Sequence, residues 1–441
     1  MRKLLLFFLS LISACTPGNA LDRQPSADYH ARRESLVNKV GGIVVLFAPL
    51  EGGDPVYSFR QEDNFYYLSG LTEPGDALLI APAVEAKDNA PARPYTEILF
   101  LPPHNLRREK FTGPKLGAEN SDAPKITGFD RVEEMDKLPD EVSKVIAGGR
   151  PVIYTDVVSE GETSASAEPL TFLRRSNAVL FFQDVKPTLT SLRTFKDAGE
   201  IGLIRKAVDA SVAAHAAAMK AVKPNVLEFE ISALMQYEWD RRGCERPSYS
   251  PIVGSGHNST ILHYSDNTNT MKAGDVVVID AAAEYSMYAA DITRTLPVNG
   301  HFTPRQREIY DIVLAAQEAA MAAFQSGKSM LVGDSDASLN KVAKDYIRSH
   351  GKDLHGQPLD QYFIHGLGHY IGLNVHDPGD YRVPLGPGAA FTIEPGIYIP
   401  EEGIGVRIED DYYVDANGKL IKLSAALPSK AADVEKAMAG K

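Results

Sequence analysis

The sequence predicts an α+β fold with an α/β N-terminal half and an internally duplicated C-terminal half. Within residues 26–187, apolar runs that resemble strands alternate with helical or turn segments, as in an α/β domain. Beyond residue 196, two helical patterns followed by strands occur twice in the same order. The two copies share no visible residue identity, so the repeated order is what indicates the duplication.

Four apolar runs give the expected strands of the N-terminal half. They are "GGIVVLFA" (41–48), "ALLIAPA" (77–83), "EILFLPP" (97–103) and "AVLFFQ" (178–183). The polar stretch "KPTLTSLRTFKD" around Pro187 marks a domain boundary. We therefore predict an N-terminal domain over residues 21–187 and a C-terminal domain over residues 188–441.

The C-terminal half is expected to begin with a long helix. Apolar residues recur at helical spacing over residues 196–222, and Pro224 ends the pattern. Thr303, Pro304 and Gln306 predict the capped start of a later helix. The full set is helices over 196–222, 228–243, 304–327 and 335–350, and strands in "VVVIDAAAEYSMYAADITRT", "AAFTIE", "GIYI" and "GVRIEDDYYV".

The composition is that of an ordinary globular protein. The chain has 441 residues, 44% hydrophobic and 24% charged, enough for two or three domains with cores of their own. Its formal charge of −12 arises from 58 acidic and 46 basic residues without a basic block. This balance argues against nucleic acid as a partner.

The first residues predict an export signal. "MRKLLLFFLSLISAC" has a basic start and an apolar run over residues 4–12, far shorter than the roughly 20 residues that span a bilayer. Its end, "ISAC", resembles the lipobox of bacterial lipoproteins, in which the cysteine is lipidated and becomes the new N-terminus. The alternative is ordinary cleavage after Ala20. We expect residues 1–20 to act in export, and Cys15 to anchor a periplasmic or cell-envelope lipoprotein.

Cysteine usage excludes a disulfide framework. The chain has 2 cysteines, and Cys15 is one of them. Cys244 is then the only other cysteine, so no internal disulfide is expected. We interpret Cys244 as a packed thiol.

Two carboxylates in one apolar segment suggest a metal. The strand "VVVID" ends in Asp280, and Asp291 follows after "AAAEYSMYAA". A hairpin that turns at Tyr285–Ser286 would place the two carboxylates opposite each other, about 5 Å apart between Cβ atoms. Like charges that face each other in a sheet repel, and burial makes their ionised forms costlier. A single aspartate would only cap a turn, but two in this setting favour a bound cation.

Three further segments strengthen the metal hypothesis. "HGLGHYIGLNVHDPG" carries three histidines, "FTIEPGIYI" ends a strand in Glu394, and "GVRIEDDYYV" buries Glu409 in the middle of a strand. Each feature has an ordinary alternative: a core histidine, a strand-end glutamate before a turn, or a pair between Glu409 and Arg407. Buried glutamates are rare unless they are paired or bind an ion. The coincidence of several such features in one domain favours a metal site.

A zinc-protease helix fails as an explanation of the histidines. His365 and His369 have the i, i+4 spacing of that motif, but Gly366 occupies the position of its glutamate. The glycines of this segment also disfavour a regular helix. The two histidines therefore need not share a metal.

With these motifs in place, the chain resembles the Xaa-Pro aminopeptidase (aminopeptidase P) and prolidase group. The resemblance lies in residues 251–295 and 365–411, and in "ADYHARRESLVNKVGGIVVLFA" and "FRQEDNFYYLSGLTEPGDALLI" of the N-terminal half. It covers nearly everything after the export signal. It implies a pita-bread catalytic domain with a dinuclear metal site, preceded by the family's N-terminal domain.

The resemblance also implies the metal ligands. Five positions match them: Asp280, Asp291, His369, Glu394 and Glu409. In the family pattern Asp291 and Glu409 bridge the two ions, Asp280 holds one, and His369 with Glu394 holds the other. Four carboxylates carry −4, which two divalent ions balance. Oxygen-rich ligation with one imidazole suits Mn²⁺, with Co²⁺ or Zn²⁺ as alternatives.

The implied reaction is hydrolysis of the Xaa-Pro bond at peptide N-termini by a hydroxide that bridges the two ions. Glu394 would carry a proton between that nucleophile and the leaving nitrogen. His263 and His376 match family histidines that contact the substrate and stabilise the oxyanion, and His365 matches a further pocket histidine. Arg407 lies two residues before Glu409 and would orient ligands from the same strand face, or else pair with a surface acid. The expected partners are proline-containing peptides and further copies of the chain in a homo-oligomer.

Two alternatives to an aminopeptidase remain open at this level. "HGLG" is more typical of prolidases, which cleave dipeptides, and the segment between Glu394 and Glu409 lacks a loop that many relatives carry. A non-catalytic binding module on the same fold is the second alternative, because family relatives without metal are known. The complete ligand set argues against that module.

Overall fold

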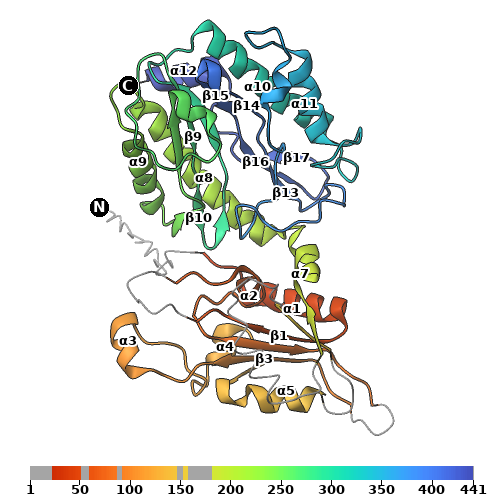
Figure 1. The fold of residues 1–441 in the computed structure, drawn as a ribbon. Helices are drawn as coiled ribbons and strands as arrows, with labels where there is room; N and C mark the ends of the chain where they lie inside the picture. Colours follow the sequence, from red (N-terminus) through yellow and green to blue (C-terminus); the bar gives the residue numbers. More distant parts are fainter. Residues whose placement is uncertain (1–21, 51–58, 87–91, 147–151, 157–180, 441) are drawn as a thin grey trace, which may run out of the picture.

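The computed structural model describes residues 22–50, 59–86, 92–146, 152–156 and 181–440. The predicted export signal with Cys15 and the first part of the strand predicted at 178–183 lie outside the described residues. Two regions lie one against the other (Figure 1): residues 22–184 form one sheet with helices around it, and the rest of the chain forms smaller sheets flanked by long helices.

A six-stranded mixed sheet forms the first region. Its strands are β1 (Ile43–Phe47), β2 (Ala77–Ala81), β3 (Thr96–Leu101), β4 (Arg131–Glu134), β5 (Val152–Thr155) and β6 (Phe181–Asp184), in the order β4-β3-β2-β1-β5-β6. Alternate residues of β1 point to opposite faces, as strand geometry requires. Val44 packs in one apolar cluster with Leu36 of α1 (Ser26–Val40), and Val45 packs in another with Val142 of α5 (Leu138–Ile146). Helices therefore cover both faces, as the sequence predicts for an α/β domain (Figure 1).

Four shorter helices complete this region and its connection to the second. They are α2 (Asp63–Ser69), α3 (Leu106–Thr112), α4 (Ala123–Thr127) and α7 (Lys186–Arg193). The polar stretch around Pro187 is thus a helix, and the boundary drawn there stays a prediction. At the end of α7, Arg193 Nη2 donates to Asp377 Oδ1 (2.6 Å), and just after the helix Lys196 Nζ donates to Asp377 Oδ2 (3.0 Å). These buried ion pairs fix the loop that carries His376.

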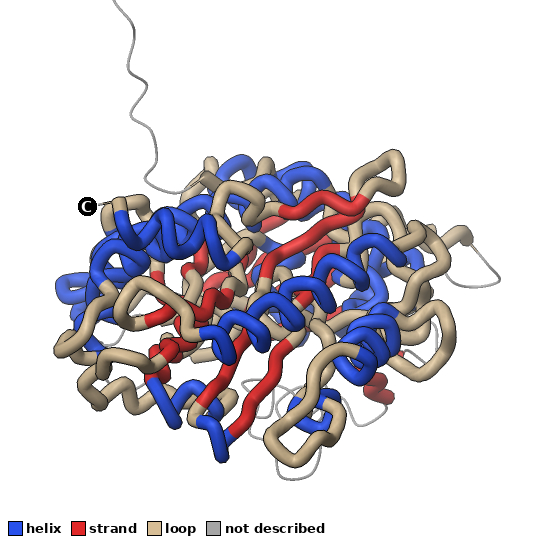
Figure 2. Tube along the Cα trace, turned by 90° about the horizontal axis from the view of Figure 1, so that it is seen from above, coloured by secondary structure: helices blue, strands red, loops and turns tan. Residues whose placement is uncertain are grey.

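The second region repeats a helix-helix-strand order. The first copy has α8 (Ala198–Ala221), α9 (Glu228–Asp240), β7 (Arg246–Pro247), β8 (Ile252–Ser255), β9 (Val276–Asp280), β10 (Ala283–Tyr285), β11 (Tyr288–Ala289) and β12 (Thr293–Pro297). The second copy has α10 (Pro304–Ala323), α11 (Leu339–Ser349), β13 (Ala390–Ile393), β14 (Gly396–Ile399), β15 (Ile404–Arg407), β16 (Asp410–Val414) and β17 (Leu420–Lys422), followed by α12 (Ala431–Ala439). The helices lie along the outside and the strands between them (Figure 2).

The two copies meet at the start of β12. Glu409 N donates to Thr293 O (3.1 Å), which joins the second copy to β12 of the first. An apolar cluster that includes Ile309, Val313 and Phe391 forms the core of the second copy. Functional side chains at this junction can therefore come from both copies.

The predicted helices form with small differences at their ends. Thr303 and Gln306 make the predicted capping box, but α10 ends at Ala323 rather than Gly327. Glu409 was predicted in the middle of a strand, but the strand is interrupted there. β15 ends at Arg407 and β16 begins at Asp410, so Glu409 lies between the two. Cys244 is buried and free, as expected.

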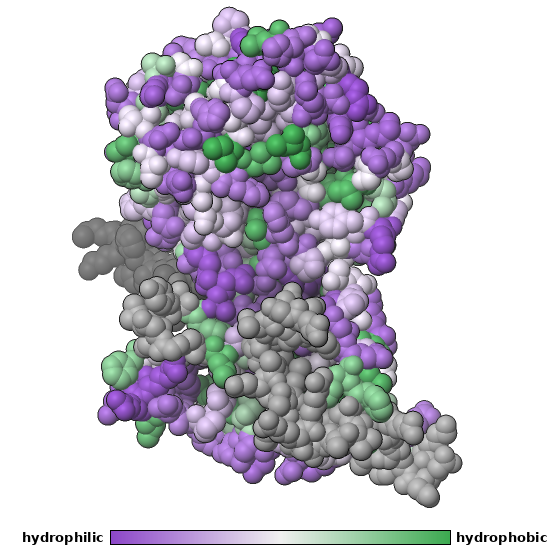
Figure 3. Space-filling view, in the orientation of Figure 1, coloured by the Kyte–Doolittle hydropathy of each residue, from purple (hydrophilic) through white to green (hydrophobic). Residues whose placement is uncertain are grey.

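The surface is mainly polar on the face shown in Figure 3, where hydrophobic residues occur in small groups. Among the described residues, no helix is both long and apolar enough to cross a membrane.

Candidate metal centre

Asp280 and Asp291 meet, but not in the predicted register. Asp280 at the end of β9 lies opposite Thr293 of β12 rather than opposite Asp291. The hairpin turns at Ser286 and Met287, both with positive φ (50° and 72°), one residue later than predicted. A one-residue shift of the turn moves the partner of Asp280 by two residues. Carboxylate oxygens of the two aspartates nevertheless lie within 4.8 Å of each other.

Two polar side chains hold the aspartates. The Tyr249 hydroxyl lies within hydrogen-bond distance of Asp280 Oδ1 and 2.7 Å from Asp291 Oδ1. Burial and the two carboxylates raise the pKa of Tyr249 well above its usual value, so this hydroxyl keeps its proton as a donor. Arg407 Nη2 donates to Asp280 Oδ2 (2.6 Å). Arg407 is buried and pairs with this aspartate, so the alternative of a surface ion pair is wrong.

Glu409 joins the cluster of carboxylates from the short interruption between β15 and β16. Its Oε2 accepts a hydrogen bond from Thr293 Oγ1 (2.7 Å), and Arg407 Nε donates to the same Thr293 oxygen (3.1 Å). Glu409 Oε1 is buried and, among the described residues, has no hydrogen-bond partner. Burial and neighbouring carboxylates raise the pKa of Glu409 well above its usual value. A buried oxygen without a partner that points at other carboxylates fits a cation ligand.

His369 lies on a loop with its Nε2 turned toward the carboxylates. The sequence predicted that this loop is not a helix, and the structure agrees. A Cβ on Gly368 would lie 2.1 Å from the carbonyl oxygen of Thr392, so only glycine permits this close approach. His369 Nδ1 donates to Tyr370 O (3.1 Å), which leaves Nε2 3.3 Å from Asp291 Oδ2 and 3.5 Å from Glu394 Oε1. Burial opposes protonation, but Asp291 and Glu394 raise the pKa of His369 to about 9.

Glu394 follows the last residue of β13. Pro395 comes directly after it and separates β13 from β14, so the carboxylate lies at a strand end. Burial raises the pKa of Glu394 to about 8, with a further contribution from Asp291 against the opposing charge of His369. A bound cation would displace this proton, so the raised pKa of Glu394 marks a position where a carboxylate needs a positive charge nearby.

The five predicted ligands form one continuous cluster. Three overlapping groups have ligand atoms within 4.8 Å of one another: Asp280, Asp291 and Glu409; His369, Glu394 and Glu409; and Asp291, His369 and His376. Carboxylate oxygens with imidazole nitrogen form a donor set suited to Mn²⁺, Co²⁺ or Zn²⁺. The unpaired Glu409 oxygen and the raised carboxyl pKa values fit divalent cations at this position.

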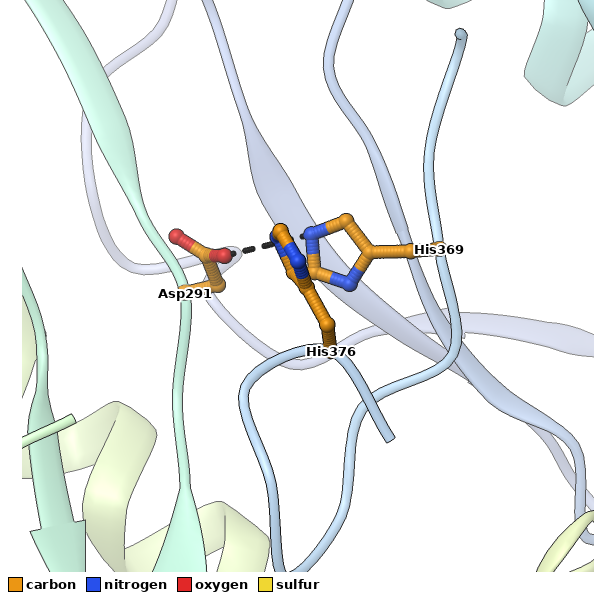
Figure 4. Close-up of side chains that lie close together, drawn as sticks. All are labelled: Asp291, His369 and His376. Atoms are coloured by element: carbon orange, nitrogen blue, oxygen red, sulfur yellow. Dashed lines mark ion pairs between the residues drawn. The ribbon is translucent and has the colours of Figure 1, made fainter. Parts of the chain in front are cut away.

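His376 lies beside His369 and opposite Asp291 (Figure 4), with its ring centroid 4.2 Å from that of His369. It is exposed, unlike the other side chains of the cluster. His376 and His263 line a cavity of about 260 Å³ together with Asp280 and Asp291. The two histidines therefore border the space in which a substrate would meet the carboxylates.

His365 stands at the other side of the cluster. Arg407 Nη1 donates to the Tyr398 hydroxyl (2.8 Å), which in turn lies 2.9 Å from His365 Nε2. His365 Nδ1 lies 2.8 Å from Gly366 O and 3.9 Å from Glu394 Oε2. Burial and the charge of Arg407 lower the pKa of His365 to about 4, so this histidine is neutral at pH 7.

Sequence reasoning missed three polar residues of the site: Tyr249, Thr293 and Tyr398. Thr293 directly follows the "DI" of Asp291 and Ile292, and Tyr398 alternates with two isoleucines in "GIYI". Thr293 and Tyr398 lie in strands and Tyr249 follows one, but only the fold shows that their side chains meet the site.

The fold and this cluster define a metallopeptidase. Residues 202–416 match the model of metallopeptidase family M24, and residues 29–154 match that of the aminopeptidase P N-terminal domain. The chain is 33% identical over 443 residues to the Xaa-Pro aminopeptidase of Escherichia coli (strain K12), which covers 93% of this chain and 97% of the relative. It therefore belongs to the Xaa-Pro aminopeptidases of metallopeptidase family M24.

Solved structures agree with this membership. Proline aminopeptidase P II from Yersinia pestis has a TM-score of 0.80 at 31% identity, over 95% of this chain and 100% of that chain. Zn-substituted Escherichia coli aminopeptidase P in complex with product has a TM-score of 0.80 at 30% identity, over 95% of this chain and 99% of that chain. The pita-bread fold expected from the sequence is confirmed, and the prolidase and binding-module alternatives are not favoured.

Proposed function

We propose that this protein removes the first residue from peptides whose second residue is proline. The observation that carries the proposal is the continuous cluster of Asp280, Asp291, His369, Glu394 and Glu409, with ligand atoms within 4.8 Å in overlapping groups. Bound divalent ions supply an activated water and polarise the scissile carbonyl. Mn²⁺ is the proposed metal, because the donors are mostly oxygen.

Each polar side chain has a proposed task in this reaction. Glu394 accepts a proton from the attacking water and delivers it to the leaving proline nitrogen, because its carboxylate lies in the cluster beside the proposed position of that water. His263 and His376 border the cavity and donate hydrogen bonds to carbonyl oxygens of the substrate. Arg407 fixes Asp280 by a 2.6 Å hydrogen bond and, through Tyr398, holds His365 in place.

Peptide length tests the proposed substrate. The protein with added Mn²⁺ is expected to cleave Ala-Pro-Ala faster than the dipeptide Ala-Pro, and to leave Ala-Ala-Ala uncut. Chromatography measures each rate through the release of free alanine, and through the release of Pro-Ala for Ala-Pro-Ala. A clear preference for Ala-Pro would favour a prolidase, and cleavage of Ala-Ala-Ala at an equal rate would contradict specificity for proline.

We further propose that the protein is a lipoprotein anchored through Cys15. The support is the short apolar run after a basic start and the lipobox-like "ISAC". A homo-oligomer also stays a prediction.

The anchor predicts how the protein fractionates. Wild-type protein expressed with its first residues is expected in the membrane fraction with a lipid-modified Cys15, and Cys15→Ala is expected to lose the lipid. Labelling with a radioactive fatty acid and fractionation by ultracentrifugation measure both. A wild-type protein that starts at Leu21 without lipid would contradict the proposal.

A further inference from the structure

A second cavity adjoins the one at the metal centre. It has a volume of about 340 Å³ and shares Val375 and His376 with the first. Its other walls include Arg60, Arg246 and Glu284. The two cavities are therefore neighbours, with Val375 and His376 forming part of the wall of each.

Arg60 reaches this cavity from the first region of the fold, and its donors are fully engaged. Arg60 Nε donates to Glu284 Oε2 (3.1 Å), Nη1 to Asp63 Oδ1 (2.8 Å) and Nη2 to Leu373 O (2.9 Å). Glu284 is almost completely buried. We interpret Arg60 as a structural link between the two regions of the fold.

Arg246, by contrast, keeps unused donors. It lies opposite Glu284 in the pairing of β7 with β10, and its Nε is 3.4 Å from Glu284 Oε1. Among the described residues this is its only ion pair, and its buried Nε donates no hydrogen bond. The neighbouring Glu245 is engaged elsewhere, because it accepts a hydrogen bond from Met287 N (3.0 Å).

Two carboxylates, Asp63 and Glu284, already occupy Arg60, so within the described part of the chain Arg246 is the guanidinium on the cavity wall that still has free donors. A guanidinium binds a carboxylate through two parallel hydrogen bonds, which a neutral group cannot replace. The free N–H groups of Arg246 offer no acceptor to the N-terminal ammonium of a substrate. The part of the peptide that follows proline, in contrast, brings either its terminal carboxylate or an acidic side chain.

We infer that Arg246 binds a carboxylate on the C-terminal side of the proline and so selects among Xaa-Pro peptides. This inference rests on the proposed function and specifies which peptides that function favours. Arg246 is a specificity-determining residue in this account, and neither a metal ligand nor part of the proton path.

Three tripeptides test the inference by their kcat/KM. Ala-Pro-Ala carries the terminal carboxylate, Ala-Pro-Ala-amide carries none, and Ala-Pro-Glu-amide carries one on its side chain. Wild-type protein is expected to prefer at least one of the two carboxylates over the neutral amide by about tenfold to a hundredfold. Comparing those two shows which source is bound.

Arg246→Gln is expected to remove this preference, mainly through KM, and to leave cleavage of the neutral amide and the metal content unchanged. Arg246→Lys is expected to retain part of it, because lysine keeps the charge and loses the paired geometry. Arg242→Gln is the matched control, since Arg242 is close in sequence and pairs with Glu238 on the surface of α9.

Three results would overturn the inference, and the first two are no carboxylate preference in the wild type and a preference that survives in Arg246→Gln. A selective effect of Arg246→Gln on Glu-Pro-Ala-amide would also overturn it, by placing the recognised carboxylate before proline. If the wild type cuts no Xaa-Pro peptide, the proposed function itself has failed. Calorimetric binding of the same peptides to Glu394→Gln protein, with and without Arg246→Gln, then still measures the role of Arg246.

Discussion

Removing divalent metal with a chelator is expected to abolish peptide hydrolysis, and added Mn²⁺ is expected to restore it. The reason is that the buried carboxylates alone do not activate a water molecule. Bound cations would make that water a sufficiently strong nucleophile. Burial already raises the pKa of Glu394 to about 8 in the absence of any ion, so protons compete with the metal for the site. Ala-Pro-Ala cleavage before chelation, after dialysis and after addition of each metal measures the effect.

Comparing the activity that several metals restore shows which ion the site prefers. Mn²⁺ is expected to restore the highest rate, and Co²⁺ or Zn²⁺ lower ones, while Mg²⁺ and Ca²⁺ restore little because they disfavour imidazole ligands. Circular dichroism of the dialysed protein checks that the fold survives the treatment. Full activity in folded protein without metal would contradict the account.

His369→Ala and His376→Ala are expected to fail in different ways, although the two imidazole rings lie only 4.2 Å apart. His369 directs Nε2 at Asp291 and Glu394, so its loss is expected to lower metal occupancy, with activity partly recovered at high metal. His376 is exposed at the cavity and is expected to act on the substrate. Its loss should leave the metal in place and lower kcat by about 10²–10³-fold, or roughly 3–4 kcal/mol.

Metal content and kcat of both variants measure this difference. His301→Ala is the control, because His301 is an exposed histidine in the loop before α10 and is expected to change neither quantity. The three-residue group of Asp291, His369 and His376 also permits a metal-binding role for His376. If His376→Ala loses metal as fully as His369→Ala, then His376 is a ligand and its proposed role is wrong.

Local patterns in the sequence were sufficient to predict most elements of the fold. Capping residues and Pro224 set the starts and ends of the long helices, because these signals act within a few residues. The hairpin turn was predicted one residue early, since Ser286 and Met287 have little intrinsic preference for positive φ. Tertiary contacts hold that turn: Glu245 accepts from Met287 N (3.0 Å) and the Tyr66 hydroxyl donates to Ser286 O (3.4 Å). No local pattern reports such contacts.

In the candidate site too, some residues stand out in the sequence and others are revealed only by the fold. Carboxylates and histidines in apolar strands or glycine-rich loops stand out in the sequence, because burial of such groups needs a reason. Their partners do not stand out: Tyr249 and Tyr398 are ordinary strand or loop tyrosines until the fold places them beside Asp280 and Arg407. Arg246 gives no sequence signal either, and only its cavity next to His376 indicates a task.

The number of divalent ions per chain in active protein tests the central claim most directly. Mass spectrometry of the metals and active-site titration on the same sample give this ratio. The account predicts two ions per active chain, shared among Asp280, Asp291, His369, Glu394 and Glu409. One ion or fewer in fully active protein would contradict a dinuclear centre.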